Sequence, residues 1–169
     1  MPRAFVRVSF LFLLVLCTAS AGEGDVIRVG DKAPLFRGTA SDGSSIKLDD
    51  YKGKPVVVIF FATWCDGCKQ ELPRVERDLQ KRFKNDGLVV LGIGRGHRAG
   101  ELAGFKRERN FSFPLIEDPR RDIYSKFATD YIPRCYLIGK DGTIKHAITG
   151  IDISDFESFK RRVEEEVKR

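Results

Sequence analysis

With 169 residues, 42% of them hydrophobic, the chain can bury the core of one ordinary domain and is too short for two. Its formal net charge of +6 falls to +4 (28 basic against 24 acidic residues) when residues 1–21 are left out. Because the excess is small and its basic residues are not interleaved with aromatic ones, no nucleic-acid partner is expected. An ordinary solvated surface is favoured over attraction to acidic partners or anionic lipid.

Residues 1–21 have the pattern of an export signal. Two arginines precede an apolar run at residues 8–16, and small residues at 19–21 fit a signal-peptidase site. The run is far shorter than the roughly 20 residues of a bilayer-spanning helix. We therefore expect cleavage and a mature domain of residues 22–169. Lipidation of Cys17 is the alternative, although a leucine stands before it where a small residue is expected.

Export places the domain where disulfides form and persist. Cleavage leaves three cysteines, Cys65, Cys68 and Cys135, and an odd number cannot all pair within one chain. A structural disulfide framework is therefore not expected.

The first half of the mature chain predicts a strand, a helix and a second strand. Residues 22–48 read as an extended lead-in with a hairpin around Asp42-Gly43. The continuous apolar run at residues 56–61 is typical of a central strand that is buried on both faces. A second run at residues 88–93 predicts a parallel neighbour, since a right-handed crossover joins such strands. The fold class is therefore α/β.

Between these strands, residues 69–83 predict an amphipathic helix. Its apolar side chains recur at spacings of three and four residues, with charged and amide side chains between them, and they are Leu72, Val75, Leu79 and Phe83. Pro73 lies inside this helix and should kink it, because proline lacks an N–H and its ring clashes with the preceding turn.

After the second strand, the glycines at positions 92, 94 and 96 do not have dinucleotide-binding spacing, and we predict a flexible loop there. Residues 101–110 and 122–129 are predicted as helices.

The end of the chain predicts a hairpin followed by a helix. Strands at residues 135–138 and 143–148 flank a Gly-Lys-Asp-Gly turn. The capping box Ser154-x-x-Glu157 then opens a final helix, which should pack on the sheet through Phe156, Phe159, Val163 and Val167.

The pair Cys65 and Cys68 stands where the central strand passes into the amphipathic helix, an arrangement suited to disulfide exchange. Two intervening residues place the sulfurs on one helical turn, within reach of the Cα separation of roughly 5.5 Å that a disulfide prefers. Cys65 lies at the helix N-terminus, where free N–H groups and the helix dipole stabilise a thiolate. We predict that Cys65 attacks and that the more buried Cys68 resolves the mixed disulfide.

Glu71 lies one turn after Cys68 and is the candidate proton acceptor for the resolving thiol. A carboxylate buried under the sheet would have a raised pKa, suited to proton transfer near neutral pH. An exposed helix glutamate is the alternative.

Two other cysteine chemistries fit the sequence less well. A closed zinc site needs two further ligands at compatible spacing, and His97, His146 and Cys135 are scattered, so neither a metal nor an organic cofactor is expected. The Pro-x-x-x-Thr-x-x-Cys pattern of peroxiredoxins is missing, because Ala62 occupies the threonine place. A thiol peroxidase remains an alternative, as does a binding module whose disulfide stays closed.

The stretch around the cysteines resembles exported thioredoxin-like proteins of the TlpA/ResA group, within the AhpC/TSA-like part of the thioredoxin superfamily. The resemblance runs from about Gly30 to the C-terminus and is strongest at residues 60–73, Phe-Phe-Ala-Thr-Trp-Cys-Asp-Gly-Cys-Lys-Gln-Glu-Leu-Pro. It implies a thioredoxin fold, with a mixed sheet flanked by helices and with an N-terminal hairpin extension. It also implies an inserted helix and strand around residues 92–110.

The resemblance also implies several site residues. Tyr131-Ile132-Pro133 looks like the cis-proline loop, in which Pro133 would face the sulfurs and the backbone of Ile132 would pair with a substrate peptide. The residues expected to contact a substrate are Trp64, Asp66, Gly67, Ile132 and Arg134. Arg134 would favour acidic partners.

The sequence departs from relatives at three places. Ile59 stands where cytoplasmic thioredoxins carry a buried aspartate, which leaves Glu71 as the remaining proton acceptor. Asp66 should destabilise the neighbouring Cys65 thiolate and make the protein a better reductant. Cys135, unusual for the family, should point into the core as a small hydrophobe, with a third redox role as the alternative.

These features predict a thiol–disulfide oxidoreductase that is periplasmic or otherwise exported and acts on disulfide-containing exported proteins. By analogy its electrons would come from a membrane protein, and lipidation at Cys17 would add membrane attachment.

Overall fold

The computed structural model describes residues 24–169, so the predicted signal peptide and Cys17 lie outside the described part. A five-stranded sheet with the order β5-β4-β3-β6-β7 forms its centre. β3 is parallel to β4, and β4 to β5, whereas β6 is antiparallel to both β3 and β7. The strands are β3 (Val56–Phe61), β4 (Val89–Arg95), β5 (Leu115–Asp118), β6 (Arg134–Ile138) and β7 (Ile144–Thr149). The predicted central strand and parallel crossover are confirmed.

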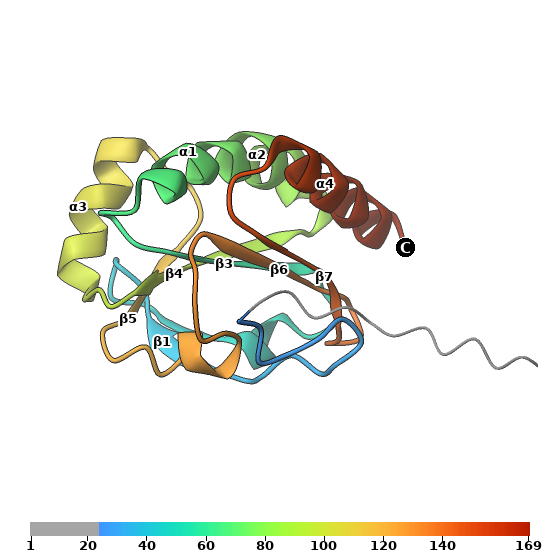
Figure 1. Ribbon diagram of the computed structural model, residues 1–169, viewed down its shortest axis with the longest axis horizontal. Helices are drawn as coiled ribbons and strands as arrows, with labels where there is room; N and C mark the ends of the chain where they lie inside the picture. Colours follow the sequence, from blue (N-terminus) through green and yellow to red (C-terminus); the bar gives the residue numbers. More distant parts are fainter. Residues whose placement is uncertain (1–23) are drawn as a thin grey trace, which may run out of the picture.

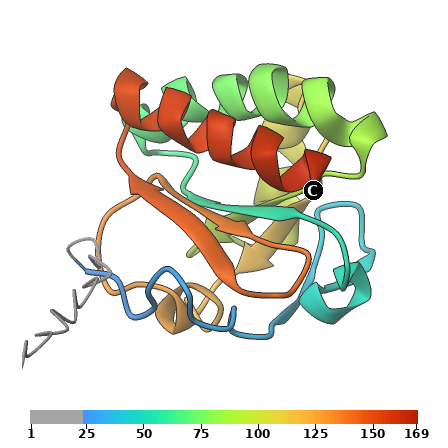
Figure 2. The ribbon, with the colours of Figure 1, turned by 90° about the vertical axis from the view of Figure 1, so that its right-hand side faces the viewer.

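Helices cover one face of the sheet and the lead-in covers the other (Figures 1 and 2). On the first face lie α1 (Asp66–Arg74), α2 (Lys81–Phe83) and α4 (Ile153–Lys168). On the second lie the predicted hairpin of β1 (Arg37–Thr39) and β2 (Ser45–Lys47) and 3₁₀ turns at Leu48–Tyr51 and Tyr124–Lys126. α3 (Ala99–Arg109) packs beside β5. The sheet therefore has two buried faces.

The residues of β3 alternate between these two faces, as side chains of a strand must. Val57, Ile59 and Phe61 join the core under α1 and α4, whereas Val56, Val58 and Phe60 join the core under the lead-in. All six are buried, which is why the run is apolar without alternation.

The helical run that follows the cysteines changes its hydrogen-bonding pattern after Pro73. α1 ends at Arg74, a π-helical segment spans Val75–Gln80, and α2 and a 3₁₀ turn at Lys84–Asp86 complete the run. Because proline cannot donate a backbone hydrogen bond, an interruption near this position is expected. It takes the form of a π-helical segment, and the predicted apolar stripe is buried throughout.

Two of the three glycines that were predicted to form a loop lie inside β4 instead. A Cβ on Gly92 would lie 2.7 Å from Leu115 Cδ2, and a Cβ on Gly94 would lie 2.7 Å from Leu102 Cδ2. These glycines therefore allow β5 and α3 to pack closely against β4. Gly96, with φ at +81°, lies in the turn after the strand.

The inserted helix and strand are confirmed, but the strand lies later than expected. α3 begins two residues before the predicted helix, and β5 comes after residues 92–110, at Leu115–Asp118. The helix predicted at residues 122–129 is wrong, since only Tyr124–Lys126 form a 3₁₀ turn.

The C-terminal hairpin and helix are confirmed, with a different capping residue. The N-cap of α4 is Asp152, whose Oδ1 accepts the backbone N–H groups of Ser154 at 2.7 Å and Asp155 at 3.2 Å. Ser154 is therefore inside the helix, and Phe156, Phe159 and Val163 are buried against the sheet.

Candidate redox site

The two cysteines lie where the chain leaves β3 and enters α1. A turn after β3 is closed by the backbone N–H of Cys65, which donates to Ala62 O at 3.2 Å. Cys65 is the N-cap of α1, and its Sγ accepts the backbone N–H of Cys68 at 3.1 Å. The pair forms a disulfide, with Cα atoms 5.2 Å apart, within the range that a disulfide bridges without backbone movement.

The two sulfurs differ in exposure. Cys65 is partly exposed, whereas Cys68, in the first turn of α1, is fully buried. A thiolate at Cys65 would accept an N–H group and face the positive end of the α1 dipole. The arrangement therefore suits attack by Cys65 and an inward position for Cys68.

Glu71 is buried completely, one turn after Cys68 on α1. Its Oε2 lies 3.3 Å from Arg74 Nη1, and its Oε1 has no hydrogen-bond partner among residues 24–169. Burial raises the pKa of this carboxyl to about 7, and the nearby Arg74 guanidinium opposes the rise. A group with this pKa can take up and release a proton near neutral pH.

The loop before β6 brings a cis peptide bond to the cysteines. The Ile132–Pro133 bond is cis, and the carbonyl oxygen of Ile132 lies 3.8 Å from Cys65 Sγ. A Cβ on Gly67 would lie 3.5 Å from Pro133 Cδ and 3.2 Å from Ile151 Cγ2. The absence of a side chain at position 67 therefore lets this loop and the start of α1 approach closely.

Exposed apolar side chains surround the pair. Trp64 is 63% exposed and Tyr131 57%, and Ile151, which packs beside Gly67, is 37% exposed. We call these three residues the apolar rim. Large side chains are exposed here although the domain buries most others, so the rim is a candidate contact surface. Trp64 was expected from the sequence, whereas Ile151 was not, because its place depends on the β7–α4 connection.

Asp66 lies on the open side of the site. Its side chain is 88% exposed and its Oδ1 is 2.9 Å from Lys69 Nζ. Its charge is therefore partly offset by a neighbouring cation and by solvent.

Arg134 does not line the site, which makes the prediction that it selects acidic partners wrong. The side chain is 1% exposed and forms an ion pair with Asp25, and its Nε donates to Asp130 O at 2.8 Å. The strand that follows Pro133 directs this side chain toward the lead-in face. A partner protein cannot contact a guanidinium that is buried in the domain.

Cys135 is a free thiol, buried between β3 and β7 in the core that also holds Cys68. Burial raises the pKa of the thiol well above its usual value, and the Glu71 charge raises it further. The prediction that the Cys135 side chain points into the core is confirmed.

His97 contacts the turn that precedes the cysteines, although its sequence position gave no sign of this contact. It is 7% exposed, and its Nε2 accepts the backbone N–H of Thr63 at 3.1 Å. Only the folding of β4 beside β3 brings residues 34 positions apart together. Residues 24–169 contain no cluster of three or more metal-ligating side chains.

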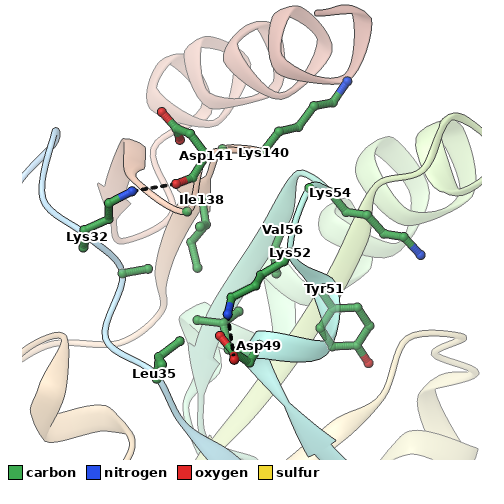
Figure 3. A pocket seen from close by; sticks show the side chains of 15 residues that line it. Lys32, Leu35, Asp49, Tyr51, Lys52, Lys54, Val56, Ile138, Lys140 and Asp141 are labelled. Carbon is green, nitrogen blue, oxygen red and sulfur yellow. Dashed lines mark hydrogen bonds and ion pairs between the residues drawn. The ribbon is translucent and has the colours of Figure 1, made fainter.

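A cavity of about 510 Å³ lies at the opposite end of the sheet (Figure 3). Its apolar wall includes Val56, the first residue of β3, and Ile138, the last of β6. At its edge Lys52 pairs with Asp49, and Lys32 donates to a backbone carbonyl. Because β3 spans roughly 20 Å and the cysteines follow its other end, the cavity is separate from the redox site.

Comparison with known proteins gives consistent matches along the chain. Residues 29–147 match the AhpC/TSA family. Among similar proteins, the thiol-disulfide oxidoreductase ResA of Geobacillus kaustophilus is 30% identical over 154 residues, which cover 88% of each chain. ResA of Bacillus subtilis is 28% identical and covers 88% of this chain and 86% of its own.

Solved structures show the same architecture. A solution structure from Bacteroides thetaiotaomicron, described as a candidate protein disulfide isomerase, has a TM-score of 0.82 and 31% identity, with 86% of this chain and 94% of the other covered. A candidate thiol:disulfide interchange protein DsbE from Chlorobium tepidum has a TM-score of 0.72 and 25% identity, and covers 82% of this chain and 97% of its own. Both share the thioredoxin fold.

Within residues 24–169, no helix combines the length and the apolar character needed to cross a bilayer. The family match spans most of the chain, and the ResA relatives are matched over nearly their full length. The chain therefore belongs to the AhpC/TSA family and is a thioredoxin-fold thiol–disulfide oxidoreductase of the ResA-like kind, which exchanges disulfides with protein partners.

Proposed function

We propose that the protein acts as a reductant of partner disulfides, with Cys65 as the attacking sulfur and Cys68 as the resolving one. The observation that carries this assignment is the unequal environment of the two sulfurs. Cys65 is accessible at the N-terminus of α1, while Cys68 is buried in the same helix, one turn from Glu71.

The protein's own dithiol supplies the two electrons for one exchange, and an external donor must reduce the resulting disulfide before the next. The Cys65 thiolate attacks one sulfur of the partner disulfide, and the other partner sulfur leaves as a thiolate and takes a proton. The Cys68 thiolate then attacks Cys65 Sγ and releases the second partner sulfur. The partner gains two electrons and two protons, and the protein is left with the Cys65–Cys68 disulfide.

Glu71 takes the proton of Cys68 in the resolving step. The unpaired Oε1 and the pKa of about 7 support this role, because a neutral-pH carboxylate there can accept a proton that solvent cannot reach. No other acidic residue lies one turn from Cys68 on the buried side of α1 within the described chain.

The partner contacts the apolar rim and the cis-proline loop. An extended partner segment pairs with the backbone of Ile132 next to Cys65, while Trp64 covers its apolar side chains. Pro133 offers no N–H beside the sulfurs, and Gly67 lets the cis-proline loop lie close to the start of α1, where the partner segment would bind. Asp66, exposed beside Cys65, lies at the edge of this surface.

Residues 1–21 direct export, and the working compartment is outside the cytoplasm. The arginines, the apolar run and the small residues at 19–21 support this part of the proposal. Reduction in an oxidising compartment requires a steady supply of electrons, for which we propose a membrane protein as donor. Mass spectrometry of the protein from cells should find an N-terminus at Gly22. A diacylated N-terminus at Cys17 would identify a lipoprotein instead.

The midpoint potential tests the direction of electron flow. Equilibration of the purified protein in thiol–disulfide redox buffers, with free thiols counted by mass, should give a value near roughly −270 mV or lower. A value near roughly −120 mV would mean that the protein oxidises its partners.

A trapping experiment tests the roles of the two sulfurs. Cys68→Ser should accumulate a mixed disulfide between Cys65 and a partner, whereas Cys65→Ser should accumulate none. Trapping through Cys68 would reverse the assignment. Rapid turnover of hydrogen peroxide by Cys65 would favour a thiol peroxidase, and a pair that never opens in these buffers would favour a binding module.

A further inference from the structure

The imidazole of His97 lies against the peptide that precedes the cysteine pair. Its Nε2 accepts the N–H of Thr63 at 3.1 Å and lies 3.4 Å from Thr63 Oγ1. The His97 backbone is held as well, since its N–H donates to Gly94 O at 3.0 Å and its carbonyl accepts the N–H of Asp118 at 3.1 Å. The ring is therefore fixed by the ends of β4 and β5.

These contacts determine which ring nitrogen carries the proton. A backbone N–H can only donate, so Nε2 must be unprotonated to accept from Thr63. The proton of the neutral ring is then on Nδ1, which lies 3.2 Å from Glu101 Oε2. Glu101 Oε2 is held in turn by the N–H of Arg98 at 2.9 Å. The start of α3 thus orients the acceptor that faces Thr63.

The peptide of Thr63 lies in the turn that leads from β3 to Cys65. Phe61, the last residue of β3, lies opposite Gly94 of β4. The next four residues form a turn, which is closed by a hydrogen bond from the Cys65 N–H to Ala62 O. Thr63 is inside this turn. A shift of its peptide would move Cys65 Sγ away from the Cys68 N–H, which now lies 3.1 Å from the sulfur.

We propose that His97 is a positioning residue for the redox pair. By accepting the Thr63 N–H, it holds the turn that presents Cys65 Sγ to the Cys68 N–H at the start of α1, and it thereby stabilises the Cys65 thiolate. The inference rests on the proposed role of Cys65 as the attacking sulfur. Loss of the acceptor should destabilise the reduced protein relative to the disulfide form.

Two substitutions separate the acceptor from the rest of the ring. His97→Gln places an amide oxygen near the position of Nε2, within reach of the Thr63 N–H, but has no donor at the position of Nδ1. His97→Asn can still donate to Glu101 but is too short to reach Thr63. Both are neutral amides, and each keeps one of the two ring contacts: glutamine keeps the contact to Thr63, and asparagine keeps the contact to Glu101.

The measurements are the rate of Cys65 alkylation by iodoacetamide in the reduced protein at pH 7, and the thiol–disulfide equilibrium with glutathione. His97→Asn should slow alkylation about tenfold and shift the equilibrium about tenfold toward the disulfide, because a hydrogen bond to a thiolate is lost. His97→Gln should remain within about twofold of the wild type.

Three results would overturn the proposal. These are wild-type behaviour of His97→Asn, equal impairment of both variants, and a proton on Nε2 in nitrogen NMR spectra of the wild type at pH 7.5. The last measurement does not depend on a variant that folds. If Cys65 of the wild type is not alkylated faster than Cys68, the proposed function fails instead, and the two failures are distinguishable.

Discussion

The carboxylate of Asp25 pairs with the guanidinium of Arg134 across 109 positions of the chain. Both side chains are buried, and Asp25 also accepts a hydrogen bond from the hydroxyl of Tyr136. Backbone hydrogen bonds from the Val26 N–H to Phe127 O and from the Thr129 N–H to Gly24 O join the lead-in to the segment before the cis-proline loop. Because Arg134 directly follows Pro133, the lead-in supports the cis-proline loop from the face opposite the cysteines.

Removal of the Asp25 charge should destabilise the domain strongly. Asp25→Asn removes the carboxylate charge from the buried ion pair with Arg134, and breaking a buried pair by removing one partner costs about 3–5 kcal/mol in other proteins. Urea unfolding followed by circular dichroism measures the loss. Asp50→Asn, at an exposed position, is the control and should stay within about 0.5 kcal/mol of the wild type. A loss below about 1 kcal/mol for Asp25→Asn would contradict the stabilising role of the pair.

The raised pKa of Glu71 predicts how stability depends on pH. The folded disulfide form holds the Glu71 proton up to a pKa of about 7, whereas the usual glutamate value is 4.5. Between these values the folded state binds more protons than the unfolded state, so the Glu71 contribution to the unfolding free energy falls as pH rises and then levels off above pH 7. The difference corresponds to about 3 kcal/mol.

Glu71→Gln should remove this fall. The variant should be close to the wild type at pH 5 and up to about 3 kcal/mol more stable at pH 8, because the amide carries no charge to bury. Glu76→Gln is the matched control, because Glu76 is also buried on this helical run. Ser112 donates hydrogen bonds to both carboxylate oxygens of Glu76, so the amide of Glu76→Gln would lose one of them and should lower the unfolding free energy. A wild-type pH profile for Glu71→Gln would refute the burial argument.

The same substitution should slow the resolving step. Without a carboxylate to take the Cys68 proton, decay of the mixed disulfide at pH 7 should fall by about 100-fold, while its formation through Cys65 changes little. Quenched-flow alkylation separates the two steps. Equal slowing of both steps would show that Glu71 does not act on Cys68.

Asp66 should lower the midpoint potential by a small amount. Its carboxylate follows Cys65 directly in the sequence, but it is mostly exposed and paired with Lys69. The midpoint potential of Asp66→Asn should therefore rise by only about 10 mV, equivalent to about 0.5 kcal/mol. Lys69→Gln, which leaves the Asp66 charge without its partner, should shift the potential in the opposite direction. Both shifts should shrink at 1 M salt. A lower potential for Asp66→Asn would contradict the electrostatic argument.

The features predicted correctly from the sequence depend on local pattern. The unbroken apolar run of β3, the spacing of Leu72 and Val75 on the helix, and the Cys-x-x-Cys pair at the strand–helix junction each identify an element from neighbouring residues. The central strand, the α/β class and the position of the redox pair could therefore be predicted, whereas the thioredoxin fold was implied by the resemblance to the TlpA/ResA group.

The features that were missed depend on contacts between distant segments. Gly92 and Gly94 resemble a loop in sequence, and only Leu115 and Leu102 explain why a strand needs glycine there. Arg134 resembles a surface cation until Asp25 is placed against it. Likewise no local pattern joins His97 to Thr63, because their contact exists only after β3 and β4 pair.

Cys135 should be replaceable by an apolar residue without loss of exchange activity. It is a buried free thiol in the same core as Cys68, and its raised pKa keeps it a thiol at neutral pH. Cys135→Ala should cost about 1 kcal/mol of unfolding free energy for the small cavity and should keep wild-type turnover. Cys135→Ser should cost about 1–3 kcal/mol more, because a hydroxyl needs a partner that the apolar core lacks. Urea unfolding and disulfide reduction assays on both variants test this. A folded Cys135→Ala protein that no longer turns over would show that a third sulfur takes part in the exchange.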